Sequence, residues 1–183
     1  MKQKMFGFSL IELMVTVSIF AISIAIAVPS FTSIVAGNTL TSARDNLMSS
    51  FNFAKTEAIR LNTNVAVCPS TDGTVCSGTE DWSQGWIVYR DTGGGTTSTV
   101  GTILRVMDNV QNVDVFHRGE TAGLTPSVFI RYVPQGYAED AAPMPAQVIA
   151  FCDGRGNAAG RALLFGATTG QARPGNEVDA NCP

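Results

Sequence analysis

The sequence is poor in the residues that most active sites and nucleic-acid surfaces need. Only one of its 183 residues is histidine, 15% are charged, and 15 acidic residues against 12 basic ones give a net charge of -3. That balance argues against a protein that coats nucleic acid. No G-x-S-x-G, Walker A or H-E-x-x-H motif is present, and His117 lies in an alternating run typical of a strand. We therefore expect no enzyme, no cofactor and no metal site.

Charge is also missing from a long N-terminal stretch. No Asp, Glu, Lys or Arg occurs between Glu12 and Arg44, and 16 of the 21 residues from Phe8 to Val28 are apolar. As a helix these residues would extend roughly 31 Å, close to the thickness of the hydrocarbon core of a bilayer. Because Lys2 and Lys4 precede the stretch, the positive-inside rule predicts a cytoplasmic N-terminus and an exported remainder.

One carboxylate interrupts this stretch. An ionised side chain at membrane depth is costly and is normally paired, so Glu12 predicts a partner. A cleavable secretory signal ending near Ala25-Ile26-Ala27 is the alternative, but such signals have apolar regions of about 7 to 15 residues and seldom carry an acid near their start. Pro29 lacks an N–H group, which predicts either a kink or the end of the membrane span.

The residues from Lys4 to Leu13, KMFGFSLIEL, resemble the class III signal of type IV pilins and type II secretion pseudopilins. The resemblance implies that a prepilin peptidase cuts after Gly7 and methylates the new N-terminal residue, Phe8. Glu12 and Pro29 then stand at the fifth and twenty-second mature positions, as in that family. The amine at Phe8, in the same or an adjacent subunit, would neutralise the Glu12 carboxylate during filament assembly.

Past Pro29 the pattern becomes amphipathic. Apolar residues recur at spacings of three or four, which predicts a helix with one face against a core. They are Leu40, Ala43, Leu47, Phe51, Ala54, Ala58 and Leu61. Asn62-Thr63-Asn64 predicts the end of this helix. Together with the apolar stretch, the pattern predicts one helix from about Ser9 to about Arg60.

Short apolar or alternating runs after Asn64, separated by Gly, Pro, Asn and Asp, predict strands. These are Val65–Cys68, Trp86–Arg90, Thr102–Met107, Val113–Arg118, Ser127–Val133, Gln147–Phe151, Arg161–Phe165 and a last one near Gln171–Arg173. The predicted fold class is α+β, a long N-terminal helix packed on a largely antiparallel β-sandwich or sheet. The expected divisions are a leader (1–7), a transmembrane and filament-core helix (8–28), an amphipathic half-helix (29–62) and a β-rich head (63–183).

All four cysteines follow the apolar stretch, so in an exported chain they would meet an oxidising compartment and form disulfides. Four cysteines allow three pairings, of which we favour Cys68–Cys76 and Cys152–Cys182. The second would close a loop of about 30 residues and stabilise by roughly 3 to 4 kcal/mol. Metal binding is the rival interpretation, but no paired C-x-x-C spacing accompanies the single histidine.

The head extends the resemblance. The segments EAIRLN from Glu57, VAVC from Val65, GWIVYRD from Gly85 and FCDGRG from Phe151 are similar to those of the GspH/FimT/FimU group of minor pilins and pseudopilins. The resemblance implies an inner-membrane minor pilin that enters an extracellular type IV pilus near its tip. Its implied partners are the prepilin peptidase, other minor pilins, the major pilin, the pilus assembly platform and inner-membrane lipid. A type II secretion pseudopilin is the alternative.

DNA binding is a further possibility, because some members of the group bind DNA through a Gly-Arg-x-Arg pattern in the C-terminal hairpin. The matching stretch here, Gly170-Gln171-Ala172-Arg173, lacks one of the two basic positions. The remaining candidates, Arg155, Arg161 and Arg173, are offset by three acidic residues in the same segment, whereas phosphate contacts need a local positive excess. DNA is therefore a possible partner that we do not favour.

Two smaller features each allow a functional and a structural interpretation. Trp82 and Trp86 would suit an aromatic contact surface or the core, and we expect the core. Asp72-Gly73 and Asp153-Gly154 could each begin a calcium loop, but the later acidic ligands are not at the required positions. We expect both pairs to form turns.

Overall fold

The structure is a computed structural model of the chain, and it describes residues 8–94, 97–110, 112–119, 128–139, 147–166, 170–176 and 180–182. The chain forms two compact units, Met1–Asn38 and Thr39–Pro183. Helix α1, Leu10–Leu61, contributes its first turns to one unit and its last turns to the other. The two units are described separately below.

The first unit holds the N-terminal turns of α1. The helix begins after Ser9, whose carbonyl accepts the Leu13 N–H at 3.2 Å. Ser9 and Glu12 have the S-x-x-E spacing of a capping box, which suits a helix start. Further along, three hydroxyls donate to carbonyls three or four residues earlier at 2.8–2.9 Å, which satisfies polar groups within the helix; they belong to Thr16, Ser18 and Ser23.

The last turns of α1 belong to the second unit, which we call the head. The helix ends in a Schellman motif, because Asn62 has a φ of 49°, Thr63 N–H donates to the Ala58 carbonyl at 3.3 Å and Asn62 N–H donates to the Ile59 carbonyl at 3.4 Å. Asparagine tolerates this left-handed conformation better than most residues. The predicted stop at Asn62 is therefore confirmed.

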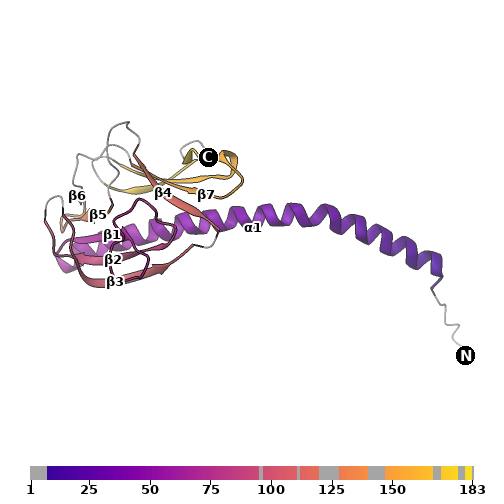
Figure 1. The fold of residues 1–183 in the computed structure, drawn as a ribbon, viewed down its shortest axis with the longest axis horizontal. Helices are drawn as coiled ribbons and strands as arrows, with labels where there is room; N and C mark the ends of the chain where they lie inside the picture. Colours follow the sequence, from indigo (N-terminus) through magenta and orange to yellow (C-terminus); the bar gives the residue numbers. More distant parts are fainter. Residues whose placement is uncertain are drawn as a thin grey trace, which may run out of the picture. The chain divides into compact units, whose positions relative to one another are not determined.

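Two antiparallel sheets make up the rest of the head (Figure 1). The first sheet has the order β3-β2-β1-β5-β6, and the second has the order β4-β7-β8-β9. The strands of the first sheet are β1 Val65–Pro69, β2 Gly85–Asp91, β3 Val100–Asp108, β5 Ile130–Tyr132 and β6 Ala138–Glu139. Those of the second are β4 Asp114–Gly119, β7 Gln147–Cys152, β8 Arg161–Phe165 and β9 Ala172–Gly175, with a 3-10 helix, η1, at Asn157–Ala159.

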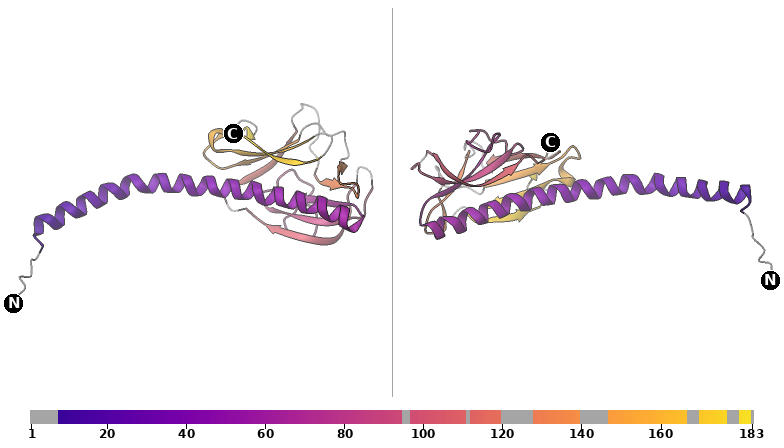
Figure 2. Two further views of the ribbon diagram at one scale, coloured as in Figure 1. Left: turned by 180° about the vertical axis from the view of Figure 1, so that it is seen from behind. Right: turned by 90° about the horizontal axis from the view of Figure 1, so that it is seen from below.

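The last turns of α1 lie between these two sheets (Figures 1 and 2) and form the centre of the core. Six of the seven residues of the predicted apolar stripe are fully or almost fully buried, and Leu61 is half-buried. At the middle of the stripe, the Phe51 ring meets Phe165 of the second sheet edge to face at 4.8 Å and Trp82 at 5.9 Å. One helical stripe thus joins the inner faces of both sheets.

The two sheets are also linked at their edges. Tyr132 of β5 donates its buried hydroxyl to the Gly170 carbonyl at 2.9 Å. Gly170 has a φ of 59°, and a Cβ there would overlap Ala138 of β6, so glycine is required at this close approach. On the other side, Asp81 forms an isolated bridge with Phe116 of β4. The α+β class and the antiparallel head predicted from the sequence are confirmed.

Two strands differ from the sequence prediction, and the positions of two tryptophans and of the histidine can be compared with it. β5 is shorter than the predicted strand Ser127–Val133, of which Ser127 lies outside the described residues. β6 was not predicted because its two residues form no apolar run. Trp82 and Trp86 are buried, which confirms their expected place in the core rather than on an aromatic contact surface; the Trp86 indole N–H donates to Ser50 Oγ at 2.9 Å. His117 lies in β4, and its side chain is outside the described residues.

Candidate assembly surfaces

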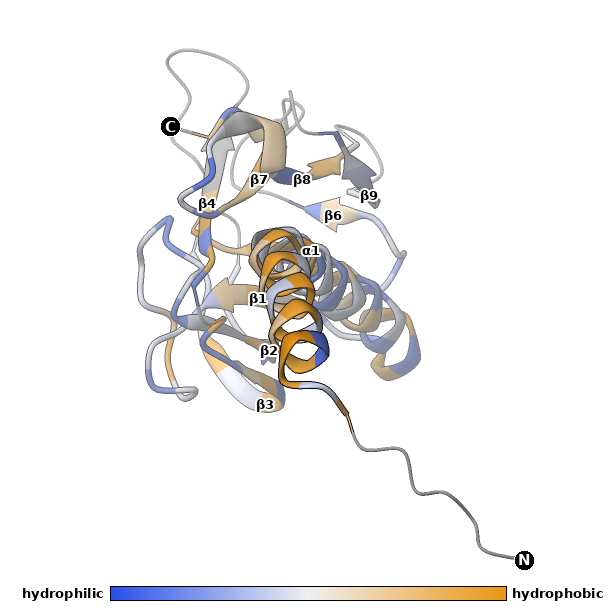
Figure 3. Ribbon diagram, turned by 90° about the vertical axis from the view of Figure 1, so that its right-hand side faces the viewer, coloured by the Kyte–Doolittle hydropathy of each residue, from blue (hydrophilic) through white to orange (hydrophobic). Residues whose placement is uncertain are grey.

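The first unit exposes an apolar surface on all sides of its helix. Sixteen large apolar side chains from Phe8 to Val35 are between 47% and 80% exposed, and the first turns of α1 are mostly orange in the hydropathy view (Figure 3). Among the described residues, α1 is the one helix long and apolar enough to cross a membrane. A helix that is apolar all round needs lipid or other helices around it.

Glu12 is the one formal charge on this surface from Phe8 to Asn38. It lies in the first helical turn, is exposed, and forms no ion pair with any residue that the structure describes. Phe8 is 80% exposed at the start of the described chain, whereas Gly7, on the other side of the predicted cleavage point, is outside it. Pro29 lies within α1, so the helix does not end there; the proline side chain is outside the described residues.

The head carries two disulfides, Cys68–Cys76 and Cys152–Cys182, with Cα–Cα distances of 5.6 and 5.7 Å. These are the two pairs that the sequence analysis favoured. Cys152–Cys182 ties the C-terminal residues to the outer face of the second sheet, where Ala180 and Cys182 pack with Val148, Ala150 and Leu164. The other disulfide closes a surface loop over the outer face of the first sheet.

Within that loop, Asp72 forms a tight turn. Its carboxylate accepts hydrogen bonds from the Thr74 N–H at 2.8 Å, the Val75 N–H at 3.1 Å and the hydroxyls of Ser70 and Thr74. Hydrogen bonding to Thr74, first by its hydroxyl and then by its N–H, holds the pKa of Asp72 well below its usual range. The donors occupy both carboxylate oxygens, as expected for a turn rather than a calcium loop.

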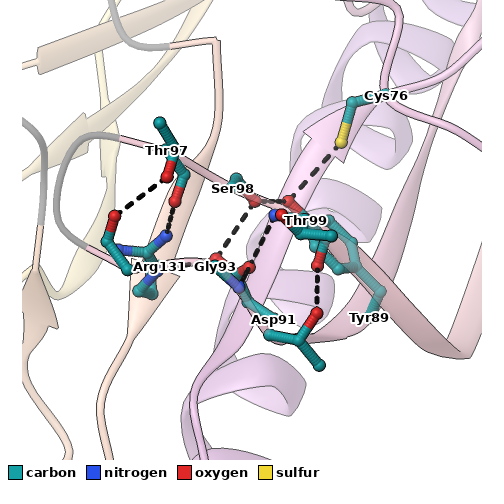
Figure 4. Close-up of polar contacts among 10 residues, drawn as sticks. Cys76, Tyr89, Asp91, Gly93, Thr97, Ser98, Thr99 and Arg131 are labelled. Atoms are coloured by element: carbon teal, nitrogen blue, oxygen red, sulfur yellow. Dashed lines mark hydrogen bonds and ion pairs between the residues drawn. The ribbon is translucent and has the colours of Figure 1, made fainter.

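A buried ion pair organises the outer face of the first sheet (Figure 4). Arg131 Nε lies 2.6 Å from Asp91 Oδ2, and both side chains are at most 1% exposed. The Arg131 guanidinium also donates to the Thr97 carbonyl. The second oxygen of Asp91 accepts the N–H groups of Gly93 at 2.9 Å and Thr99 at 2.8 Å. The pair thus holds both described ends of the β2–β3 connection against the sheet.

Ala66 explains how Arg131 reaches Asp91. In the strand register Ala66 of β1 lies between Arg131 of β5 and Tyr89 of β2, so all three side chains share one face of the sheet. The small methyl group leaves room for the guanidinium to cross β1. Ser98 donates to Asp91 at 3.0 Å, which leaves its oxygen to accept the Tyr89 hydroxyl. Burial raises the pKa of Tyr89 to about 12.

Of the three candidate DNA-binding arginines, Arg155 and Arg161 both act on the Asp153 carboxyl, whose pKa is lowered first by the hydrogen bond from Arg155 and also by the charge of Arg161. Arg155 is ion-paired with Asp153 at 2.6 Å, and Arg161 donates to the carbonyls of Ala159 and Gly160. Arg173 is exposed and pairs with Leu164 on the outer face, whereas Arg161 lies three residues before Leu164 and so on the opposite face. The arrangement gives no local concentration of positive charge for phosphates.

The first turns of the helix are apolar and exposed, and its last turns fill the core of an antiparallel two-sheet head. This arrangement defines a pilin-like subunit. The family model for the prokaryotic N-terminal methylation motif matches residues 2–28, and that for the type II transport protein GspH matches residues 43–170. The chain therefore belongs to the GspH family of minor pilins and pseudopilins. Its role is that of a minor pilin in type IV pili or type II secretion.

Solved structures agree on the fold. Two crystal forms of the type IV minor pilin FimU from Pseudomonas aeruginosa match with TM-scores of 0.56 and 0.54, each at 17% identity. The matches cover 80% and 79% of this chain and 93% and 97% of the FimU chains. A search of curated proteins finds no match. The methylation motif implies processing by a prepilin peptidase and membrane anchoring, and the family of structural pilins implies assembly with other pilins.

Proposed function

We propose that the chain is a minor pilin of the type IV pilus that enters the filament near its tip and helps to initiate it. The observation that carries this proposal is the first unit, where an all-round apolar surface surrounds a single carboxylate with no described ion-pair partner. Within the described residues nothing covers this apolar surface and nothing forms an ion pair with this carboxylate. A bundle of neighbouring pilin helices would do both. The fold match to a type IV minor pilin supports the pilus over other filaments.

In this proposal, residues 1–7 are a leader removed by the prepilin peptidase after Gly7. Residues 8–28 then span the inner membrane with the N-terminus in the cytoplasm, and the head lies in the periplasm before the subunit passes into the pilus. Residues 29–62 continue the helix, and residues 63–183 form the β-rich part of the head. The methylated amine of Phe8, in an adjacent subunit, neutralises Glu12 and sets the axial stagger between subunits.

Replacement of Glu12 tests the assembly step. We expect Glu12→Ala to leave membrane insertion and leader cleavage intact but to remove the protein from sheared pilus fractions, because the neighbouring amine loses its counter-charge. Ser18→Ala is the matched control, since Ser18 is an exposed polar residue on the same helix whose hydroxyl bonds its own backbone at 2.8 Å. Normal recovery of the Glu12 variant in sheared pili contradicts the proposal.

The family match also supports a second candidate, a type II secretion pseudopilin. Deletion of the gene distinguishes the two, with piliation, twitching and exoprotein secretion measured in one strain. We expect loss of pili and twitching with secretion unchanged. Loss of secretion with intact pili would assign the chain to the secretion system instead.

A further inference from the structure

The described residues of the head expose four large apolar side chains, and these fall into two groups. Val75 is 56% exposed and Val106 is 46% exposed, both on the side of the edge strand β3. Ile59 is 53% exposed and Tyr137 is 47% exposed, both on the side of β6. β3 ends one side of the first sheet and β6 ends the other (Figure 1). The two groups therefore lie at opposite edges of one sheet.

The first group, with its two flanking carboxylates, forms what we call the β3 site. Val106 meets the loop that the Cys68–Cys76 disulfide closes, because a Cβ on Gly73 would come within 2.9 Å of a Val106 methyl group. Val75 lies two residues beyond Gly73 in this loop, which the disulfide and the bonds to Asp72 hold in place. Exposed apolar groups that are already fixed bind a partner at a low cost in entropy. The residues of the β3 site are Asp72, Gly73, Val75, Val106 and Asp108.

The β3 site is acidic. Asp108 is exposed and lies two residues beyond Val106, so the side chains of both belong to the outer face of the sheet. Asp72 is exposed in the neighbouring loop, and neither carboxylate forms an ion pair with a residue that the structure describes. The cation of β3, Arg105, lies on the opposite face, 4.4 Å from the centre of the Phe53 ring. The site therefore suits an apolar surface that carries cations.

The second group forms what we call the β6 site, where the turn between β5 and β6 meets the last turns of α1. A Cβ on Gly136 would come within 2.9 Å of Ile59 and within 3.8 Å of Lys55, so the turn packs on both side chains. Tyr137 follows Gly136 directly. The residues of the β6 site are Lys55, Ile59, Arg60, Gly136 and Tyr137.

The β6 site offers cations. Lys55 forms no ion pair with any described residue, and the Arg60 side chain is 63% exposed although it lies 2.6 Å from Glu57. Glu139 of β6 pairs in register with Arg131, so it belongs to the outer face and not to this site. The β6 site thus places cations beside an exposed apolar side chain, whereas the β3 site places carboxylates beside exposed apolar side chains.

We propose that the β3 site of one head binds the β6 site of a second copy of this chain. In this contact the two exposed valines cover Ile59, and Asp108 faces Lys55. Because the two sites differ and lie at opposite edges, the contact is heterologous and can repeat from one copy to the next, which suits a filament. The inference rests on the proposed function, since a filament is what aligns the copies.

Photocrosslinking in cells with an intact pilus system tests the contact. A photoreactive phenylalanine analogue replaces Val75 in the full-length protein or, in a second variant, Val106, and both positions are exposed. Arg173, exposed on the outer face of the second sheet, is the control position. An epitope-tagged copy is co-expressed, so that a product between two copies is recognised by its mass. We expect positions 75 and 106, but not 173, to crosslink to residues 55–60 of the other copy, identified by mass spectrometry.

A charge exchange supplies the second arm. Asp108→Lys alone and Lys55→Glu alone, each introduced into both copies, are expected to lower the crosslinking yield from position 75 by about tenfold, because each change brings like charges together. The variant with both changes again places opposite charges across the contact and should recover most of the yield. A loss of yield caused by misfolding would not be reversed in this way.

Equal yields from positions 75 and 173, products with a different pilin alone, insensitivity to the single charge changes, or no recovery in the double variant would each overturn the contact. Recovery of the protein in sheared pili, measured in parallel, separates this inference from the proposed function. A chain that enters pili without the crosslink contradicts the contact between copies alone. A wild-type chain that is absent from pili contradicts the minor-pilin function and, with it, the contact.

Discussion

The two units of the chain satisfy their apolar and charged groups in opposite ways. In the head, the apolar stripe of α1 is covered by two sheets, and the buried charges of Asp91 and Arg131 lie 2.6 Å apart. In the first unit, Phe20 is 69% exposed on an apolar surface, and Glu12 has no ion-pair partner among the described residues. The described residues of the head cover its apolar stripe and pair its buried charges, whereas the first unit requires other molecules to cover its apolar surface and pair its charge.

This difference explains how one helix serves both units. From Thr39 onward the buried apolar residues occupy a single stripe, so a helix with one buried face suffices. From Phe8 to Val35 apolar residues surround the axis, and no single neighbouring sheet could cover them. Under the proposed function, lipid would surround this helix before assembly, and a helical filament core would replace the lipid without any change in the head.

The largest expected effect comes from removing a ring at the centre of the stripe. Phe51→Ala leaves a cavity between Trp82 and Phe165 and should destabilise the head by about 3 to 5 kcal/mol. Phe20→Ala removes the same ring from the first unit and should leave the unfolding of the head unchanged. Thermal unfolding of the full-length protein in detergent, followed by near-ultraviolet circular dichroism, compares them. Equal losses would remove the distinction between the units.

The sequence was sufficient to predict the stripe and its end because both are local. The spacing of Leu40 to Ala58 and the turn chemistry at Asn62 depend on residues within a few turns of one another. The Asp91–Arg131 pair joins residues 40 positions apart, and it needs a small residue at position 66 in the intervening strand. No local pattern marks such a pair. The order of the strands in the two sheets is likewise not visible in strand-by-strand periodicity.

The buried ion pair of the head can be compared with the exposed carboxylate of the first unit. Arg131→Met should destabilise the head by about 3 kcal/mol, because the Asp91 carboxylate stays buried without its cation. Glu12→Gln, a change at the exposed carboxylate of the first unit, should leave head stability unaltered. Urea midpoints of the full-length protein in detergent measure both. The double variant Asp91→Leu/Arg131→Met should recover part of the loss, since no charge is then stranded. A double variant no better than Arg131→Met would show that the hydrogen bonds that Asp91 accepts from the Gly93 and Thr99 N–H groups, which the double variant also loses, matter as much as the charge.

The smallest expected effect is a dependence of stability on pH that the head should show and the first unit should not. Burial raises the pKa of Tyr89 in the folded head to about 12, against about 10 in the unfolded chain, so the neutral phenol favours folding. That contribution is fully present below pH 10 and is lost as pH rises from about 10 to about 12, an effect of roughly 2 kcal/mol. Burial also raises the pKa of Tyr132, so Tyr89→Phe should reduce the alkaline loss without abolishing it. The three tyrosines all lie beyond residue 38. The urea midpoint of the head in detergent, followed by near-ultraviolet circular dichroism, should therefore fall as the pH rises from about 10 to about 12, while the far-ultraviolet signal of the apolar helix persists. Loss of the apolar helix signal over the same pH range would mean that the first unit depends on the head for its helical structure.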